Sequence, residues 1–335
     1  MKTAKIDLHC HLDGSLYLPW AYETAKKRGV VDSNYSFEEY YERYYQKNFK
    51  DRTESIKKFD FPVSILQTKE DISDAVYYLI RTLHEEEMYY VEIRFATQQH
   101  TKLGLTQKEA MLAAIDGLNR GKKDYPDVIV NLIDCMMHKG ENAYANWKEN
   151  EETIEVVKEL LGQGVVGLDL AGYENNGDYK LYAPLFEKAR EYGIPYTMHA
   201  GEMGEGIHVI DALQMGAHRI GHGVNCIQNE EWLKEVVASQ VPLEVCPSSN
   251  TKYDFNYVRH PVLQLIRSGA KVTINSDNMV YARTSVAHEH TVLRQIGVTE
   301  EELKKCTLNA VDAAFCDENT KELLRKKLEE TWHGF

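Results

Sequence analysis

Eight short apolar runs, rich in valine and isoleucine, recur along the 335-residue chain. Longer stretches with helical periodicity separate them. The apolar residues within a run are continuous rather than alternating, which is typical of parallel strands buried on both faces. The runs predict strands over Ala4–His9, Tyr90–Ala96, Val128–Met136, Val165–Ala171, Pro195–Ala200, Arg219–His222, Pro242–Cys246 and Lys271–Ser276.

The segments between these strands are amphipathic, and several end in glycine, as helices commonly do. Eight β-α units in about 250 residues are the pattern of a (β/α)8 TIM barrel. The sequence therefore predicts an α/β fold of this class, with its active site at the C-terminal ends of the strands. Helices are predicted over Asp71–Glu86, Thr106–Lys122, Glu152–Leu161, Tyr182–Tyr192, Val209–Met215 and Glu230–Ser239.

Two regions lie outside the barrel repeat. Residues 31–70 are crowded with tyrosine, phenylalanine and charged residues, which predicts a helical insertion over the top of the barrel. Such a segment can act as a lid, although aromatic helices are more often simple packing. Residues Thr299–Gly334 predict further helices that flank the barrel. Since the chain has no linker-like stretch and no internal repeat, we expect residues 1–335 to form a single catalytic domain.

The charge balance excludes some classes of partner. The chain has 39 Lys and Arg against 52 Asp and Glu, a formal net charge of −13. Nucleic acids and anionic membranes both reward clustered positive charge, so neither is expected to bind, and no protein partner is indicated. The six cysteines form no C-x-x-C pair, and no apolar window has the length of a membrane span or a signal peptide. These features favour a protein of the reducing cytoplasm.

Polar residues follow several of the apolar strands directly. The first strand ends in His9-Cys10-His11, and alternate residues of a strand point to the same side. Both imidazoles can therefore face one metal ion, while Cys10 points away and is expected to be structural. An H-x-H pair alone is a weak signal, because two such histidines are as often hydrogen-bonded surface groups.

Strands five, six and eight end in His199-Ala200-Gly201-Glu202, in His222 and in Asp277-Asn278. Singly, each has a structural explanation, such as a satisfied core histidine or a helix N-cap. Together, three histidines and a carboxylate at one rim supply the ligands of a catalytic divalent metal with a position left for water. Zinc is the preferred metal, with iron, cobalt and manganese also open. Glu202 could then protonate a bound heteroatom, and His222 could orient or deprotonate the water.

An ordered set of motifs resembles the adenosine deaminase family of the amidohydrolase superfamily. It runs across most of the chain: DLHCHLDGS (7–15), VEIRFA (91–96), GVVGLDLAGYE (164–174), MHAGE (198–202), RIGHG (219–223), LEVCPSSN (243–250), HPV (260–262) and TINSDN (273–278). The resemblance implies that one metal ion per chain is bound by His9, His11, His199 and Asp277. It also implies that Glu202 protonates purine N1 while His222 assists the water that attacks C6, with loss of ammonia.

The same resemblance implies contacts to the substrate. Asp13 matches the family aspartate that contacts the ribose 5′-hydroxyl, and Gly172 matches the glycine whose backbone N–H meets purine N3. Asn278 departs from the pattern best known in animal members, which have a second aspartate there. Because purine N7 accepts a hydrogen bond, an asparagine amide can serve as its donor at any pH. These matches favour adenosine and 2′-deoxyadenosine as substrates, in purine salvage.

Other functions remain open from the sequence. The enzyme could deaminate another 6-aminopurine, such as adenine or a modified adenosine. A phosphorylated substrate would call for Arg or Lys near residues 12–19, which contain neither, although Arg52, Lys57 or Lys58 could reach the pocket. DLHCH also resembles the start of the PHP-type metal phosphoesterases, which should have more ligands and a cationic phosphate pocket. A barrel that binds a nucleoside without turning it over is the third alternative.

Overall fold

The computed structural model describes residues 5–45, 57–139, 142–174, 178–251 and 256–332. Its strands form two parallel sheets, ordered β1-β2-β3-β4 and β5-β6-β7-β8. Backbone bridges between Leu168 and Tyr196 and between Cys10 and Asp277 join the sheets at both seams. The predicted α/β barrel is therefore confirmed. The strands are β1 Ile6–His11, β2 Tyr90–Phe95, β3 Ile129–Lys139, β4 Val165–Tyr173, β5 Thr197–Ala200, β6 Arg219–His222, β7 Leu243–Val245 and β8 Val272–Ile274.

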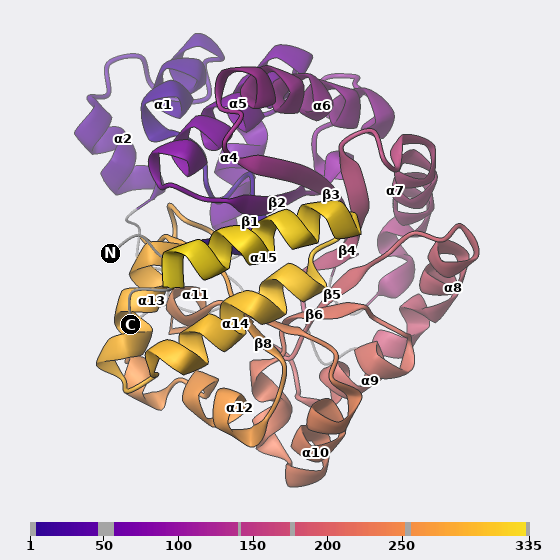
Figure 1. Ribbon diagram of the computed structural model, residues 1–335. Helices are drawn as coiled ribbons and strands as arrows, with labels where there is room; N and C mark the ends of the chain where they lie inside the picture. Colours follow the sequence, from indigo (N-terminus) through magenta and orange to yellow (C-terminus); the bar gives the residue numbers. More distant parts are fainter. Residues whose placement is uncertain (1–4, 46–56, 140–141, 175–177, 252–255, 333–335) are drawn as a thin grey trace.

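Helices surround the strands, and α14 and α15 lie side by side across the front of the barrel in Figure 1. The helices are α1 Leu18–Lys27, α2 Phe37–Tyr44, α4 Asp60–Ile65, α5 Lys69–Glu85, α6 Gln107–Asp124, α7 Trp147–Leu160, α8 Ala183–Glu191, α9 Ile207–Gln214, α10 Glu230–Ser239, α11 Pro247–Thr251, α12 Val262–Ser268, α13 Val286–Gln295, α14 Glu300–Ala313 and α15 Glu318–Trp332. Short 3-10 turns occur at η1 Lys57–Phe59, η2 Thr97–Gln99, η3 Ala143–Asn146, η4 Tyr179–Tyr182, η5 Val224–Gln228 and η6 Tyr257–Arg259.

Local sequence explains where several helices begin. At the start of α6, Glu109 N donates to Thr106 Oγ1 at 3.2 Å, and Thr106 N donates back to the Glu109 carboxylate at 3.0 Å. Thr299 and Glu302 form the same reciprocal pair at the start of α14. Each pair provides acceptors for two backbone N–H groups that would otherwise have no partner in the first helical turn.

The first strand ends two residues later than predicted. It runs over Ile6–His11 instead of Ala4–His9, and Ala4 lies outside the described residues. The backbone explains the shift, because His11 pairs with Arg94 of β2 and its N–H donates to Asp277 O at 2.7 Å across the seam. Polar side chains ended the apolar run in the sequence, whereas the ladder of hydrogen bonds continues through them. Strands β3 and β4 likewise extend beyond their apolar runs.

Buried charges occupy the interior of the barrel. Arg219, the first residue of β6, donates to Glu244 at 2.6 Å and to Glu92 at 2.5 Å, and all three side chains are fully buried. The turn between α14 and α15 closes this N-terminal end, since Arg219 also donates to Ala313 O at 2.9 Å and Phe315 N donates to Glu92 at 2.6 Å. The candidate site lies at the opposite end of the barrel, where the strands have their C-terminal ends.

The insertion after β1 is helical in its described part, which comprises α2, η1 and α4. Its aromatic residues pack together: Tyr40 is fully buried and its ring lies 5.7 Å from those of both Tyr44 and Phe61. Tyr281, from the loop after β8, stacks on Tyr45 at 5.1 Å and so ties the insertion to the barrel rim. Its role as a lid stays a prediction.

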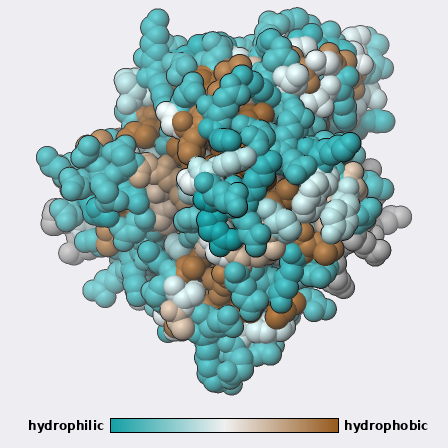
Figure 2. All heavy atoms as spheres, turned by 90° about the vertical axis from the view of Figure 1, so that its right-hand side faces the viewer, coloured by the Kyte–Doolittle hydropathy of each residue, from teal (hydrophilic) through white to brown (hydrophobic). Residues whose placement is uncertain are grey.

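Figure 2 shows a mainly hydrophilic face in which hydrophobic side chains form several small areas. Among the described residues, no helix combines the length and the apolar character needed to span a bilayer.

Candidate active site

A cavity of about 330 Å³ opens at the C-terminal ends of the strands. Each site residue predicted from the sequence, apart from His9, lines it: His11, Asp13, Gly172, His199, Glu202, His222, Asp277 and Asn278. His9 is fully buried next to this wall and contacts His11. The topology explains the convergence, because the carboxyl ends of parallel barrel strands all meet at one rim.

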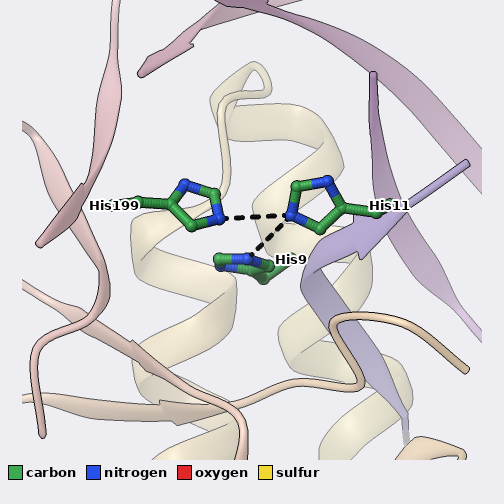
Figure 3. Close-up of side chains that lie close together, drawn as sticks. All are labelled: His9, His11 and His199. Atoms are coloured by element: carbon green, nitrogen blue, oxygen red, sulfur yellow. Dashed lines mark hydrogen bonds between the residues drawn. The ribbon is translucent and has the colours of Figure 1, made fainter. Parts of the chain in front are cut away.

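Three histidine rings point toward one another at the base of the cavity (Figure 3). His11 Nε2 lies 3.2 Å from His9 Nε2 and 3.2 Å from His199 Nε2. The first two rings come from β1 and the third from β5. Asp277 follows β8 and completes the group, with Oδ1 3.6 Å from His9 Nε2 and 3.4 Å from His11 Nε2.

Buried carboxylates hold the far nitrogens of two of these rings. His9 Nδ1 lies 2.8 Å from Glu244 Oε2, and His199 Nδ1 lies 2.9 Å from Asp169 Oδ2. Arg94 connects the two carboxylates, because its guanidinium lies 3.0 Å from each of them. Burial opposes ionisation of Asp169, but His199 and Arg94 hold the pKa of its carboxyl below the usual range.

This arrangement fits a divalent metal. A carboxylate at Nδ1 fixes the proton on that nitrogen, so the lone pair at Nε2 faces the cluster. Burial and the nearby Arg94 hold the pKa of His9 well below its usual range, and burial lowers the pKa of His11 to about 3. Burial also opposes the charge of His199, but Asp169 holds the pKa of this ring above its usual value. A metal ion binds each ring only in its neutral form. Converging lone pairs and a carboxylate oxygen repel one another without a cation between them. Imidazole nitrogens and a carboxylate oxygen are donors that zinc and other divalent transition metals bind.

Glu202 and His222 lie beside this cluster. His222 Nε2 is 3.7 Å from Glu202 Oε2, and the two side chains come from the ends of different strands. His222 has a φ of 62°, in the left-handed region that non-glycine residues rarely adopt. Such backbone strain is common at functional sites, where the surrounding structure maintains it.

The loop that bears Glu202 wraps around another carboxylate, that of Glu174 at the end of β4. Glu174 accepts hydrogen bonds from the successive backbone N–H groups of Gly201, Glu202 and Met203 at 2.6, 2.9 and 2.9 Å. His208 Nδ1 adds a contact of 2.9 Å. Burial opposes ionisation of Glu174, but these hydrogen bonds hold the pKa of its carboxyl below the usual range. Glu174 therefore holds the backbone of the loop that carries Glu202.

The three residues expected to contact substrate lie on other parts of the wall. Burial raises the pKa of Asp13 to about 6, and no donor among the described residues reaches its Oδ1. Gly172 has a φ of 109°, and a Cβ there would lie 2.6 Å from His138 O. Asn278 Nδ2 donates to Asp277 Oδ1 at 2.6 Å, and an amide nitrogen has a second hydrogen to offer.

The cavity is also lined by residues of the insertion and by lysines. Phe59, Asp60 and Val63 of the insertion line it, which shows that this segment forms part of the wall. Three lysines from separate elements also line it: Lys58, Lys102 and Lys139. Of the cations considered from the sequence, Lys58 is therefore at the cavity, whereas Arg52 lies outside the described residues.

Sequence reasoning missed the residues that support the site. Arg94, Asp169 and Glu244 each interrupt an apolar strand, and all are fully buried. A charged residue inside a buried strand must be paired, so its position was a signal that a network exists. The identity of the partners was not readable, because they are 75 or more residues apart in the chain.

Known proteins resemble this chain over nearly its whole length. The sequence model of the family described as adenosine deaminase matches residues 4–331. Adenosine deaminase from Clostridium perfringens is 37% identical over 332 residues, which cover 97% of this chain and 98% of the relative. Adenine deaminase from Arthrobacter aurescens has a TM-score of 0.86 at 24% identity, covering 98% of this chain and 99% of that one. A zinc-bound amidohydrolase from Burkholderia ambifaria has a TM-score of 0.85 at 19% identity, covering 98% and 90%.

Proposed function

The chain belongs to the adenosine deaminase family, and we propose that the cavity hydrolyses adenosine, and 2′-deoxyadenosine, to the corresponding inosine and ammonia. The observation that carries this proposal is the convergence of His9, His11, His199 and Asp277 next to Glu202 and His222. The family is metal-dependent, and we propose zinc as the ion held by the first four residues. A divalent ion there supplies a Lewis acid that lowers the pKa of water to about 7.

The chain's own residues direct the attack of water on purine C6. Glu202 provides a proton to N1, which gains basicity as C6 becomes tetrahedral, so this contact stabilises the transition state more than the substrate. The oxygen of the water forms a bond to C6, and the bond between C6 and the amino nitrogen breaks. One hydrogen of the water reaches N1 through Glu202, and the other leaves with the amino group as ammonia. The Gly172 N–H meets N3, because a glycine lets the backbone approach a flat ring closely. The second amide hydrogen of Asn278 is assigned to N7.

A screen of 6-aminopurines tests this function. We expect purified protein to convert adenosine and 2′-deoxyadenosine faster than adenine or AMP. The change in ultraviolet absorbance between the aminopurine and its deaminated product measures each rate. AMP is the second candidate, because three lysines line the cavity, whereas the buried Asp13 opposes a phosphate next to it. If the protein deaminates none of these compounds, the proposal is rejected. A preference for AMP would favour the second candidate. The cytoplasm remains our proposed location.

Asp13 provides a test of nucleoside recognition. Asp13→Ala is expected to lower kcat/KM for adenosine by about 10- to 100-fold, because a hydrogen bond to a charged group in a buried site is lost. Turnover of free adenine, which has no ribose, should change much less. Asp60→Ala is the matched control, since Asp60 also lines the cavity but is exposed. Equal losses on both substrates would show that Asp13 does not contact the ribose.

Glu174 provides a test of the loop. Glu174→Gln keeps the size of the side chain but turns an amide toward backbone N–H donors, so Glu202 should shift. We expect kcat to fall about tenfold, since misplacements of an ångström cost up to about 100-fold. Metal content, measured by elemental analysis, should be retained. Glu205→Gln makes the same change at an exposed position of the same loop and should have no effect. An unchanged kcat in Glu174→Gln would contradict the role of this carboxylate.

A further inference from the structure

Asn250 closes the motif LEVCPSSN and His260 opens the motif HPV, and the two side chains meet beside His222. Asn250 Nδ2 lies 3.1 Å from His222 Nδ1, and His260 Nε2 lies 3.3 Å from Asn250 Oδ1. His222 and His260 are both buried, with exposed fractions of 1% and 8%. The three side chains therefore form a continuous chain of hydrogen bonds that leads into the active site.

The contact of His260 with the backbone determines which group donates in each hydrogen bond of this chain. The backbone N–H of Val262 donates to His260 Nδ1 at 3.1 Å. A backbone N–H is only ever a donor, so His260 Nδ1 must be an acceptor and must lack a proton. Burial lowers the pKa of His260 to about 3, so the ring is neutral and its single proton is on Nε2.

The remaining contacts follow from this start. His260 Nε2–H donates to Asn250 Oδ1, which determines how the Asn250 amide is oriented. Its Nδ2 group then faces His222 and donates to Nδ1. A histidine that accepts at Nδ1 has its proton on Nε2 when it is neutral. That nitrogen is the one that faces Glu202, at 3.7 Å.

We propose that Asn250 and His260 are positioning residues that hold His222 as the Nε2–H tautomer, so that His222 acts as a hydrogen-bond donor in the cavity and not as the base that takes a proton from water. The inference rests on the proposed function. Of the two roles expected for His222 from the sequence, it selects orientation over deprotonation. A donor placed where negative charge develops during attack on C6 stabilises the transition state without any proton transfer.

Asn250→Asp reverses the polarity of this chain without changing its size. A carboxylate accepts from both rings, so the proton of His222 should move to Nδ1 and leave a lone pair at Nε2. Nitrogen NMR of the zinc-loaded enzyme with labelled histidine should show His222 protonated on Nε2 in the wild type and on Nδ1 in the variant. Its signal is assigned by comparison with His222→Asn. We expect kcat for adenosine to fall about 100-fold or more, because a wrong histidine tautomer is costly in catalysis, while KM changes less than about threefold.

Three further variants separate this role from a general effect on folding. Asn229→Asp makes the same chemical change at the exposed N-cap of α10, where either residue caps the helix, and should be unchanged. His260→Gln can still donate to Asn250 and should retain nearly full activity. His260→Leu cannot donate, so the amide can rotate, and kcat should fall about tenfold, the value of one lost hydrogen bond. This pair tests the proposal even if Asn250→Asp fails to fold.

A wild-type His222 protonated on Nδ1, or equal activity in His260→Gln and His260→Leu, would overturn the inference. The NMR result does not depend on which substrate the enzyme uses. A wild-type enzyme that leaves every 6-aminopurine unchanged would reject the proposed function, whereas an active enzyme with the wrong tautomer would reject only the present inference.

Discussion

Replacing Glu202 by glutamine is expected to lower kcat for adenosine by about 100- to 10,000-fold, the range that general acids contribute. Glutamine has nearly the same shape, and its amide cannot give up a proton to N1. The metal ligands are untouched, so metal content should stay at the wild-type level. Steady-state kinetics with adenosine, together with elemental analysis of the same preparation, measure both quantities.

The loop offers a matched control for this variant. Glu205→Gln removes the same charge three residues further along, from an exposed side chain. It should keep wild-type kcat, which would show that the effect of Glu202→Gln is not a general effect of charge on the loop. Near wild-type turnover in Glu202→Gln would show that another group protonates N1.

Removal of the metal is expected to abolish turnover and to lower stability. Chelation leaves His9, His11 and His199 with converging nitrogens and no cation between them, at contacts of 3.2 Å. A ligand present at about 100 times its dissociation constant stabilises a protein by about 2.7 kcal/mol, so the melting temperature should fall on chelation. Addition of zinc should restore activity and melting temperature together. A metal-free preparation with full activity would refute the assignment.

A histidine substitution provides the corresponding genetic test. His11→Asn should reduce the metal content well below the wild-type value of about one ion per chain, since a catalytic zinc needs all its protein ligands. His84→Asn is the control, because the His84 side chain is partly exposed on α5, lies 2.9 Å from Asp127 and does not line the cavity. Equal metal content in both variants would place the metal elsewhere.

Much of the barrel could be predicted because its periodicity is local. The bounds of β6 and α10 agree with the prediction, and each of the eight strands exists. Errors gather where the site is built: β1 extends two residues further than its apolar run, through His11. Functional residues replace apolar ones there, so hydrophobicity no longer marks the strand, although its backbone pairing continues.

The candidate site was predictable for a related reason. Motifs such as HCH and HAGE come directly after strands, and parallel strands in a barrel deliver their C-terminal ends to one place. Knowing the fold class was therefore enough to bring His9, Glu202 and Asp277 together without any knowledge of distances. Their chemical roles came from residue type and from the resemblance to the family, and they remain proposals.

By itself, the sequence determined the barrel, the set of side chains at its rim and the chemistry available to them. Only the tertiary structure decided how those side chains are held. Arg94 joins the carboxylates behind two ligands, Glu174 supports the loop of Glu202, and His260 orients His222 through Asn250. The physical reason is that hydrogen bonds act over about 3 Å and depend on direction. Partners separated by many residues meet at that range only after the barrel has closed, and no periodicity in the chain records which of them will do so.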